Sequence, residues 1–217
     1  MIDSVEITRV SVIDDDPPAR DSYELTLEDL GLQAVPENGP LGDMNTCIGV
    51  VRGKADAALC DHHLKVKAYS MFNGAELVAK LYQLNFPAVL CTNWNNASVD
   101  EMRPFRRFIA SLVDPKTLDP HSLRYGLESC IMEFKGDFRA VRRPWRTLVR
   151  VEDMPEAEQG VPFIYVAVPA WSAEIVRLPS TVFPEGIRKA LAPGFRLHAK
   201  VNLGASGHEE LFFEDWE

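Results

Sequence analysis

The chain has 217 residues, of which 46% are hydrophobic, enough for one large packed domain or two small ones. Its formal net charge of -9 argues against general affinity for nucleic acid or anionic lipid. No stretch has the apolar length of a membrane span, and the N-terminus lacks the features of a signal peptide, so we expect a cytoplasmic protein.

Residues 1–135 alternate short apolar or β-branched runs with helix-like patterns, which predicts a parallel sheet with helices on both faces. Pro17 and Pro18 open the first helix, Ser98 is the expected cap of the fourth, and Asp119 before Pro120 is a typical start for the fifth. The expected strands are 5–13, 32–35, 56–60, 86–91 and 110–113, and the expected helices are 17–31, 44–51, 74–84, 98–109 and 120–134.

The pattern changes after Lys135 and Gly136, and residues 136–217 contain five strand-like runs separated by Pro and Gly turns. A closed or half-closed barrel is the predicted arrangement because it removes exposed strand edges. We therefore expect an α/β domain over 1–135 and a small β-rich domain over 136–217. The expected strands of the second domain are 146–151, 163–168, 173–178, 195–203 and 210–213, with a helix near 184–191.

The four cysteines form no CxxC pair, and two of them end strand-like runs. We expect buried thiols in a reducing compartment, with no disulfide and no zinc site. They are Cys47, Cys60, Cys91 and Cys130.

Acidic residues follow two of the predicted strands at the point where each strand ends. Asp14, Asp15 and Asp16 follow the first strand, Asp61 follows the third, and Thr92 ends the fourth. Open α/β sheets bind ligands at the carboxyl ends of their strands, where strand order reverses. Carboxylates held together there repel each other, so such a pocket normally contains a hard cation such as Mg²⁺. The alternative is that the three consecutive aspartates only complement the dipole of the following helix.

The sequence at these positions resembles the receiver domain of two-component response regulators, over residues 5 to 134. The family resemblance implies a flavodoxin-like, doubly wound, five-stranded parallel sheet. It rests on Val12-Ile13-Asp14-Asp15-Asp16-Pro17 with Arg20, on Asp61, on Asn73-Gly74, on Thr92 and on Asp114-Pro115.

The resemblance also implies a role for each site residue. Asp14, Asp15 and Asp61 would bind Mg²⁺, and Asp61 would accept a phosphoryl group from a histidine kinase. The hydroxyl of Thr92 would sense that group and pass the change on. The implied partners are the kinase and a downstream protein target, and the implied role is signalling, with no enzymatic activity and no cofactor besides Mg²⁺.

The chain departs from the family pattern in two places. Asp114 occupies the position where the family has a lysine, so Lys116 is the candidate for a substitute cation. The loop from Asp61 to Gly74 is longer than the family loop. We expect its His62 and His63 to be an exposed pair, while His62, Lys65 or Lys67 is a further source of positive charge for the pocket.

Two other functions stay open at this point. Because Asp114 adds repulsion, the first domain is alternatively a pseudo-receiver, an adaptor that is not phosphorylated. The arginine-rich segment from Arg139 to Arg150 alternatively binds RNA or docks within the protein. Residues 136–217 have no helix-turn-helix pattern, which leaves DNA binding unsupported, and the apolar residues of the helix beginning at Pro120 permit a homodimer.

Overall fold

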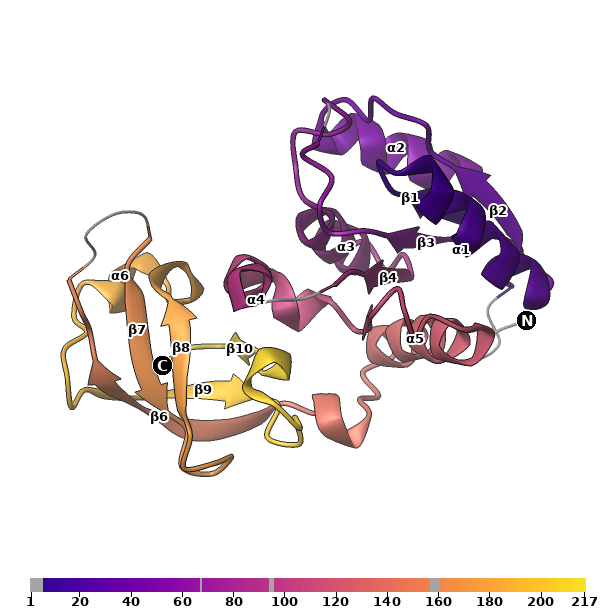
Figure 1. The fold of residues 1–217 in the computed structure, drawn as a ribbon. Coiled ribbons are helices and arrows are strands. Elements are labelled where there is room, and N and C mark those ends of the chain that lie inside the picture. The colour runs from indigo at the N-terminus through magenta and orange to yellow at the C-terminus, as the bar shows by residue number, and fades with distance from the viewer. Residues whose placement is uncertain (1–5, 67, 94–95, 157–160) are drawn as a thin grey trace. The chain divides into compact units, whose positions relative to one another are not determined.

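The computed structural model describes residues 6–66, 68–93, 96–156 and 161–217. The chain forms two compact units (Figure 1). The N-terminal unit consists of residues 1–94 and 108–137, and the C-terminal unit consists of residues 95–107 and 138–217. The C-terminal unit is therefore built from two separate pieces of chain, and we call residues 95–107 the inserted segment.

The N-terminal unit contains a five-stranded parallel sheet in the order β2-β1-β3-β4-β5, with helices between the strands. This confirms the predicted flavodoxin-like sheet. The strands are β1 (Arg9–Ile13), β2 (Gln33–Pro36), β3 (Ala57–Cys60), β4 (Ala88–Cys91) and β5 (Leu112–Val113). The helices are α1 (Pro17–Asp29), α2 (Met44–Lys54), α3 (Gly74–Gln83) and α5 (Pro120–Phe134).

The helices cover the sheet because their apolar stripes match its buried faces. Strands β3 and β4 are buried along their whole length, as expected for central strands of a covered parallel sheet. Helices α1 and α5 pack on one face, where Leu27 and Leu127 join the core of Val10, Val12 and Val89. Helix α5 begins at a capping box in which the Ser122 amide donates to the Asp119 carboxylate at 2.7 Å.

The C-terminal unit contains an antiparallel sheet in the order β10-β9-β6-β7-β8. Strands β10 and β8 lie at its two edges and do not pair with each other, so the sheet is a half-barrel and not a closed one. Its inner face holds a core that includes Val149, Val166, Leu178, Leu197 and Phe183. The elements are β6 (Trp145–Asp153), β7 (Phe163–Ala167), β8 (Ile175–Pro179), β9 (Arg196–Val201), β10 (Phe213–Glu214) and the short helix α6 (Glu185–Arg188), with 3-10 turns η2 (Ala140–Arg142), η3 (Ser180–Val182) and η4 (His208–Glu210).

The inserted segment differs from the single helix predicted over 98–109. Helix α4 (Asn96–Met102) gives way to the 3-10 helix η1 (Arg103–Phe108). Pro104 has no amide hydrogen and disfavours an α-helical residue before it, which accounts for the change. The predicted cap at Ser98 rests on a side chain outside the described residues. A second difference lies near the C-terminus, where part of the predicted strand 210–213 belongs to η4 and the strand itself is β10.

All four cysteines are buried and free, as predicted. Within the described residues, none of the helices combines the length and the apolar character that a membrane crossing requires.

Candidate functional site

The parallel register of the N-terminal sheet brings three predicted site residues, and Asp114 with them, to one edge. Ile13 pairs with Cys60, and the Asp61 amide donates to the Ile13 carbonyl at 2.9 Å, so Asp14 and Asp61 follow side by side. Between the next two strands of the sheet, β4 and β5, the Thr92 amide donates to the Val113 carbonyl at 2.9 Å. Asp114 follows Val113 directly, so Asp14, Asp61, Thr92 and Asp114 all lie at the carboxyl ends of the strands.

Asp14 is the most deeply buried acid at this edge, with 5% of its surface exposed. Burial raises the pKa of its carboxyl group from 3.8 to about 6. A hydrogen bond from the Asp16 amide at 2.8 Å lowers that pKa, while the charges of Asp61, Asp15 and Asp16 raise it further. Burial is the largest cause of the shift, and the neighbouring carboxylates add to it.

Asp61 is half-buried and its position is fixed by its backbone and its own loop. Its carboxylate accepts a hydrogen bond from the His63 amide at 2.7 Å. Helix α3 begins at Gly74, where an added Cβ would lie 1.7 Å from the Asp61 carbonyl oxygen, so only glycine fits. The Gly74 amide in turn donates to the His62 carbonyl at 2.8 Å. The start of α3 therefore closes directly over the loop that carries Asp61.

Thr92 has 1% of its surface exposed, and its hydroxyl has no hydrogen-bond partner among the described residues. A buried hydroxyl without a partner costs free energy, of the order of 1 to 3 kcal/mol. An unsatisfied donor beside two carboxylates is suited to binding an oxygen atom of a ligand that enters this edge.

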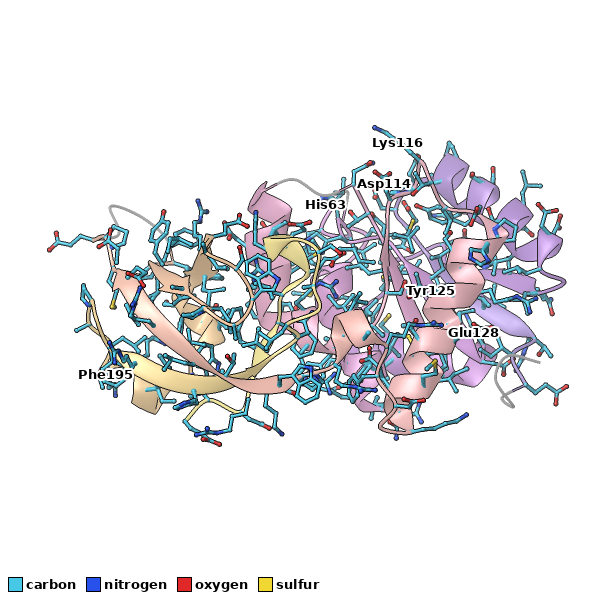
Figure 2. The ribbon with its side chains drawn as sticks, turned by 90° about the horizontal axis from the view of Figure 1, so that it is seen from below. His63, Asp114, Lys116, Tyr125, Glu128 and Phe195 are labelled. Atoms are coloured by element: carbon cyan, nitrogen blue, oxygen red, sulfur yellow. The ribbon has the colours of Figure 1, made fainter. Side chains whose placement is uncertain are left out.

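Asp114 and Lys116 occupy a turn after β5. The Lys116 amide donates to the Asp114 carboxylate at 2.8 Å, while the Lys116 side chain is exposed and extends outward (Figure 2). Burial raises the pKa of the Cys91 thiol to about 12, a hydrogen bond with Tyr23 lowers it, and the charges of Asp61, Asp14 and Asp114 raise it further. Asp114 thus contributes to the same negative field as the other two acids.

Positively charged side chains do not neutralise the acids within the described part of the chain, where Asp14, Asp15 and Asp61 form no ion pair. Arg20 is buried, and its guanidinium donates to the backbone carbonyl of Asp14 instead of to a carboxylate. The expectation that His62 is exposed was wrong, because only 1% of its surface is accessible, whereas His63 and Lys65 are exposed. Lys67 lies outside the described residues.

The donor set fits Mg²⁺. This ion prefers oxygen ligands, keeps several of its waters and is usually bound through only one or two carboxylates. Asp14 and Asp61, with half-buried Asp15 next to them, supply such carboxylates, and none of the three forms an ion pair with another described residue. Among the described residues, no three acidic, histidine or cysteine side chains are gathered closely enough to form a complete metal cage. An ion here would therefore depend on water for much of its coordination.

The arginine-rich segment is used within the C-terminal unit. Arg142 has 5% of its surface exposed, and its guanidinium donates to the carbonyl oxygens of Arg106 and Arg107 at 3.2 and 2.9 Å. Arg146 pairs with Glu217 at 2.8 Å. The arginines of the inserted segment itself were not singled out from the sequence, although the run Arg103-Pro104-Phe105-Arg106-Arg107 holds three arginines in five positions of an acidic chain.

The parallel sheet order 2-1-3-4-5, with acids at the carboxyl ends of its first and third strands, is the arrangement of flavodoxin-like receivers. The N-terminal unit has the fold of a receiver domain.

Solved receiver domains are among the structures similar to this chain. The signal receiver domain of a modulated diguanylate cyclase from Desulfovibrio desulfuricans G20 is 20% identical, with a TM-score of 0.47, over 60% of this chain and 98% of that one. A response regulator receiver domain protein from Clostridium thermocellum is 12% identical, with a TM-score of 0.45, over 59% and 97%. One from Methanospirillum hungatei JF-1 is 18% identical, with a TM-score of 0.44, over 60% and 98%. Neither a protein-family model nor a curated protein sequence matches the chain.

Proposed function

We propose that the protein is a response regulator of a two-component phosphorelay, which accepts a phosphoryl group on Asp61 from a histidine kinase. One observation carries this proposal: Asp14 and Asp61 follow paired residues at the carboxyl ends of β1 and β3, where the charge of Asp61 helps to raise the pKa of buried Asp14. Such a pair of carboxylates suits a divalent cation and the phosphoryl chemistry that depends on it.

The position of each site residue gives it a separate role in this reaction. Asp14, Asp15 and Asp61 would hold Mg²⁺, which when bound neutralises charge on the phosphoryl oxygens. A carboxylate oxygen of Asp61 forms the new bond to phosphorus while the bond from phosphorus to the kinase imidazole breaks, and the imidazole leaves with that electron pair. The buried hydroxyl of Thr92 is placed to donate to a phosphoryl oxygen, which would satisfy its missing hydrogen bond.

The experiment is incubation of the full chain with acetyl phosphate and Mg²⁺, followed by intact mass measurement. We expect one added phosphoryl group on the wild type and none on Asp61→Asn. The matched control is Asp56→Asn, which changes an acid at the opposite end of β3 that bonds Thr8 and Arg9, and it should be phosphorylated like the wild type. An unmodified wild type, or equal modification of Asp61→Asn, would exclude this chemistry.

A second candidate function is a pseudo-receiver adaptor. Asp114 favours it, because a carboxylate stands where the receiver pattern has a lysine and the Lys116 side chain is exposed. Titration with Mg²⁺ distinguishes the two functions: a working site raises the thermal stability of the N-terminal unit, and an adaptor without a site shows no change. The downstream target would be a protein in either case.

RNA binding through Arg139 to Arg150 is not favoured. Arg142 is buried beneath its own unit's contacts, and both Arg146 and Arg150 pair with acids in the same unit. Of the exposed cations and aromatics that a stacking surface for bases requires, this segment has Trp145 and Arg143, while Arg142 is buried and Arg146 and Arg150 are paired.

A further inference from the structure

The inserted segment is held in the C-terminal unit at several separate points along its length. Near its start, Asp100 forms an ion pair with Arg177 of β8. Further along, one guanidinium nitrogen of Arg103 donates to the carbonyl oxygens of His208 and Leu211, at 2.5 and 2.8 Å. Arg103 has 3% of its surface exposed, and burial lowers its pKa to about 10, so it remains charged at neutral pH.

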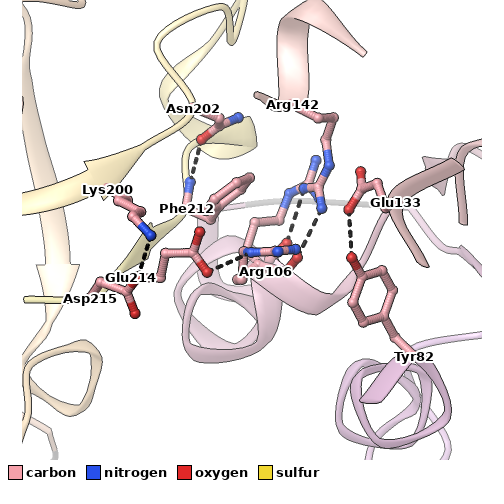
Figure 3. A network of polar contacts seen from close by, with 10 residues as sticks. Tyr82, Arg106, Glu133, Arg142, Lys200, Asn202, Phe212, Glu214 and Asp215 are labelled. Atoms are coloured by element: carbon pink, nitrogen blue, oxygen red, sulfur yellow. Dashed lines mark hydrogen bonds and ion pairs between the residues drawn. The ribbon is translucent and has the colours of Figure 1, made fainter. Parts of the chain in front are cut away.

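The end of the segment is held by two more arginines that share the aromatic ring of Phe212, and Figure 3 shows that ring together with Arg142 and Glu214. Arg107 pairs with Glu214 of β10 at 2.7 Å, and its guanidinium lies 5.3 Å from the centre of the Phe212 ring. Arg142 lies 4.8 Å from the centre of the same ring and donates to the carbonyl oxygens of the segment's last turn. Charge-assisted hydrogen bonds and cation–π contacts of this kind are stronger than neutral ones when they are desolvated.

The inserted segment is joined along the chain to the strands that carry the candidate site. Thr92 precedes the segment by three positions in the sequence, and β5, which precedes Asp114, begins five positions after Arg107. Hydrogen bonds from the Thr92 amide to Val113 and from the Leu90 amide to Ser111 close the base of this loop in the N-terminal unit. The stretch of chain between the predicted sensing hydroxyl and the atypical acid is therefore anchored in the other unit.

We propose that Arg103, Arg107 and Arg142 are positioning residues for the candidate site, because they hold the inserted segment in the C-terminal unit and so fix the ends of the loop that carry Thr92 and Asp114. The inference rests on the proposed function for its biological meaning. Coupling between two sites is reciprocal, so a change at Thr92 would also alter how firmly the C-terminal unit holds the segment.

The experiment measures residue-resolved hydrogen exchange in the full chain without any ligand. The variant is Arg142→Gln, and the matched control is Arg143→Gln, which changes the neighbouring exposed arginine. We expect Arg142→Gln to speed exchange by at least about tenfold both in residues 99–107 and at the Thr92 amide. The Asp61 amide, which bonds Ile13 in the same unit as Thr92, should keep its rate, and Arg143→Gln should leave all three rates unchanged.

Faster exchange in 99–107 with an unchanged Thr92 amide would show a purely structural role and overturn the proposal, as would equal behaviour of the two variants. If Arg142→Gln unfolds the C-terminal unit, Glu214→Gln decides instead, since it weakens a single half-buried ion pair. A smaller increase of the exchange rates in residues 99–107 and at the Thr92 amide of Glu214→Gln supports the proposal. An unchanged Thr92 amide in that variant overturns it.

These measurements need no phosphorylation, so the two proposals fail separately. A wild type that gains no mass from acetyl phosphate, together with the expected exchange pattern, removes the phosphorelay and leaves the positioning role. If Asp61 is phosphorylated at the same rate in the wild type and in Arg142→Gln, and the Thr92 amide keeps its exchange rate, the phosphorelay stands and the positioning role is excluded.

Discussion

Replacing Asp14 by asparagine should stabilise the metal-free protein at neutral pH. The pKa of Asp14 rises from 3.8 to about 6 on folding, so the folded state binds a proton more tightly than the unfolded state. The stability that the protonated carboxyl group contributes is therefore fully present below pH 3.8 and is lost as the pH rises through about 6. A shift of this size corresponds to about 3 kcal/mol at pH 7, because each pKa unit is worth about 1.4 kcal/mol.

Asparagine removes that charge while keeping an oxygen that can accept the hydrogen bond from the Asp16 amide. The free energy of unfolding is measured by urea titration in the presence of a chelator, with hydrogen exchange in β1 and β3 reporting on the N-terminal unit. We expect a gain of up to about 3 kcal/mol at neutral pH that shrinks toward zero near the unfolded-state pKa of 3.8.

The matched control is Asp21→Asn, which changes an exposed acid on α1 and should alter stability by less than about 0.5 kcal/mol. Equal or lower stability of Asp14→Asn at neutral pH, or a gain that does not depend on pH, would refute the reasoning. With Mg²⁺ present the order should reverse, because the wild type alone keeps the full set of carboxylates.

Three further outcomes are expected. Gly74→Ala should destabilise the N-terminal unit by roughly 3 kcal/mol or more, because the new Cβ would lie 1.7 Å from the Asp61 carbonyl oxygen, and a thermal melt measures this. The control Gly53→Ala, which has open space around it in α2, should be neutral or slightly stabilising. A double-mutant cycle on Arg107→Gln and Glu214→Gln should give a coupling energy of about 1 kcal/mol, since the pair is half-buried at 2.7 Å, and additive effects would contradict that contact. Calorimetric Mg²⁺ affinity should fall about tenfold per pH unit below about 6, where a proton competes for the buried carboxyl at the end of β1, and a flat profile would exclude that ligand.

The sheet and its site edge could be predicted because their signals are local. A short apolar run followed by an acid marks both a buried strand and its carboxyl end, as at Asp14 and Asp61, and parallel connections then bring such ends together. The depth at which Asp14 is buried is not visible in the sequence. It depends on how the following loop and helices cover the edge, and that burial is the largest cause of its raised pKa.

That residues 95–107 belong to the C-terminal unit could not be predicted from the sequence, for a different reason. A helical pattern shows which face of an element is apolar, but not which core that face meets. The contacts that decide it are made by Arg103, Arg107 and Arg142 to backbone carbonyls and to a phenylalanine ring, and such partners leave no spacing rule in the sequence. For the same reason the sequence could not decide between a closed and a half-closed barrel, since closure of a sheet depends on pairing between strands far apart in the chain.

The two-piece construction of the C-terminal unit limits how this gene can be cut and recombined. A chimaera spliced after residue 137 would carry the β strands to a new host without residues 95–107, leaving Glu214 and Arg177 without their ion-pair partners and Phe212 without Arg107. During synthesis the ribosome must likewise complete the C-terminal strands before that early stretch finds its place. Exchanging either unit as an independent module would therefore break contacts within the C-terminal unit, and we expect the two units to be inherited together.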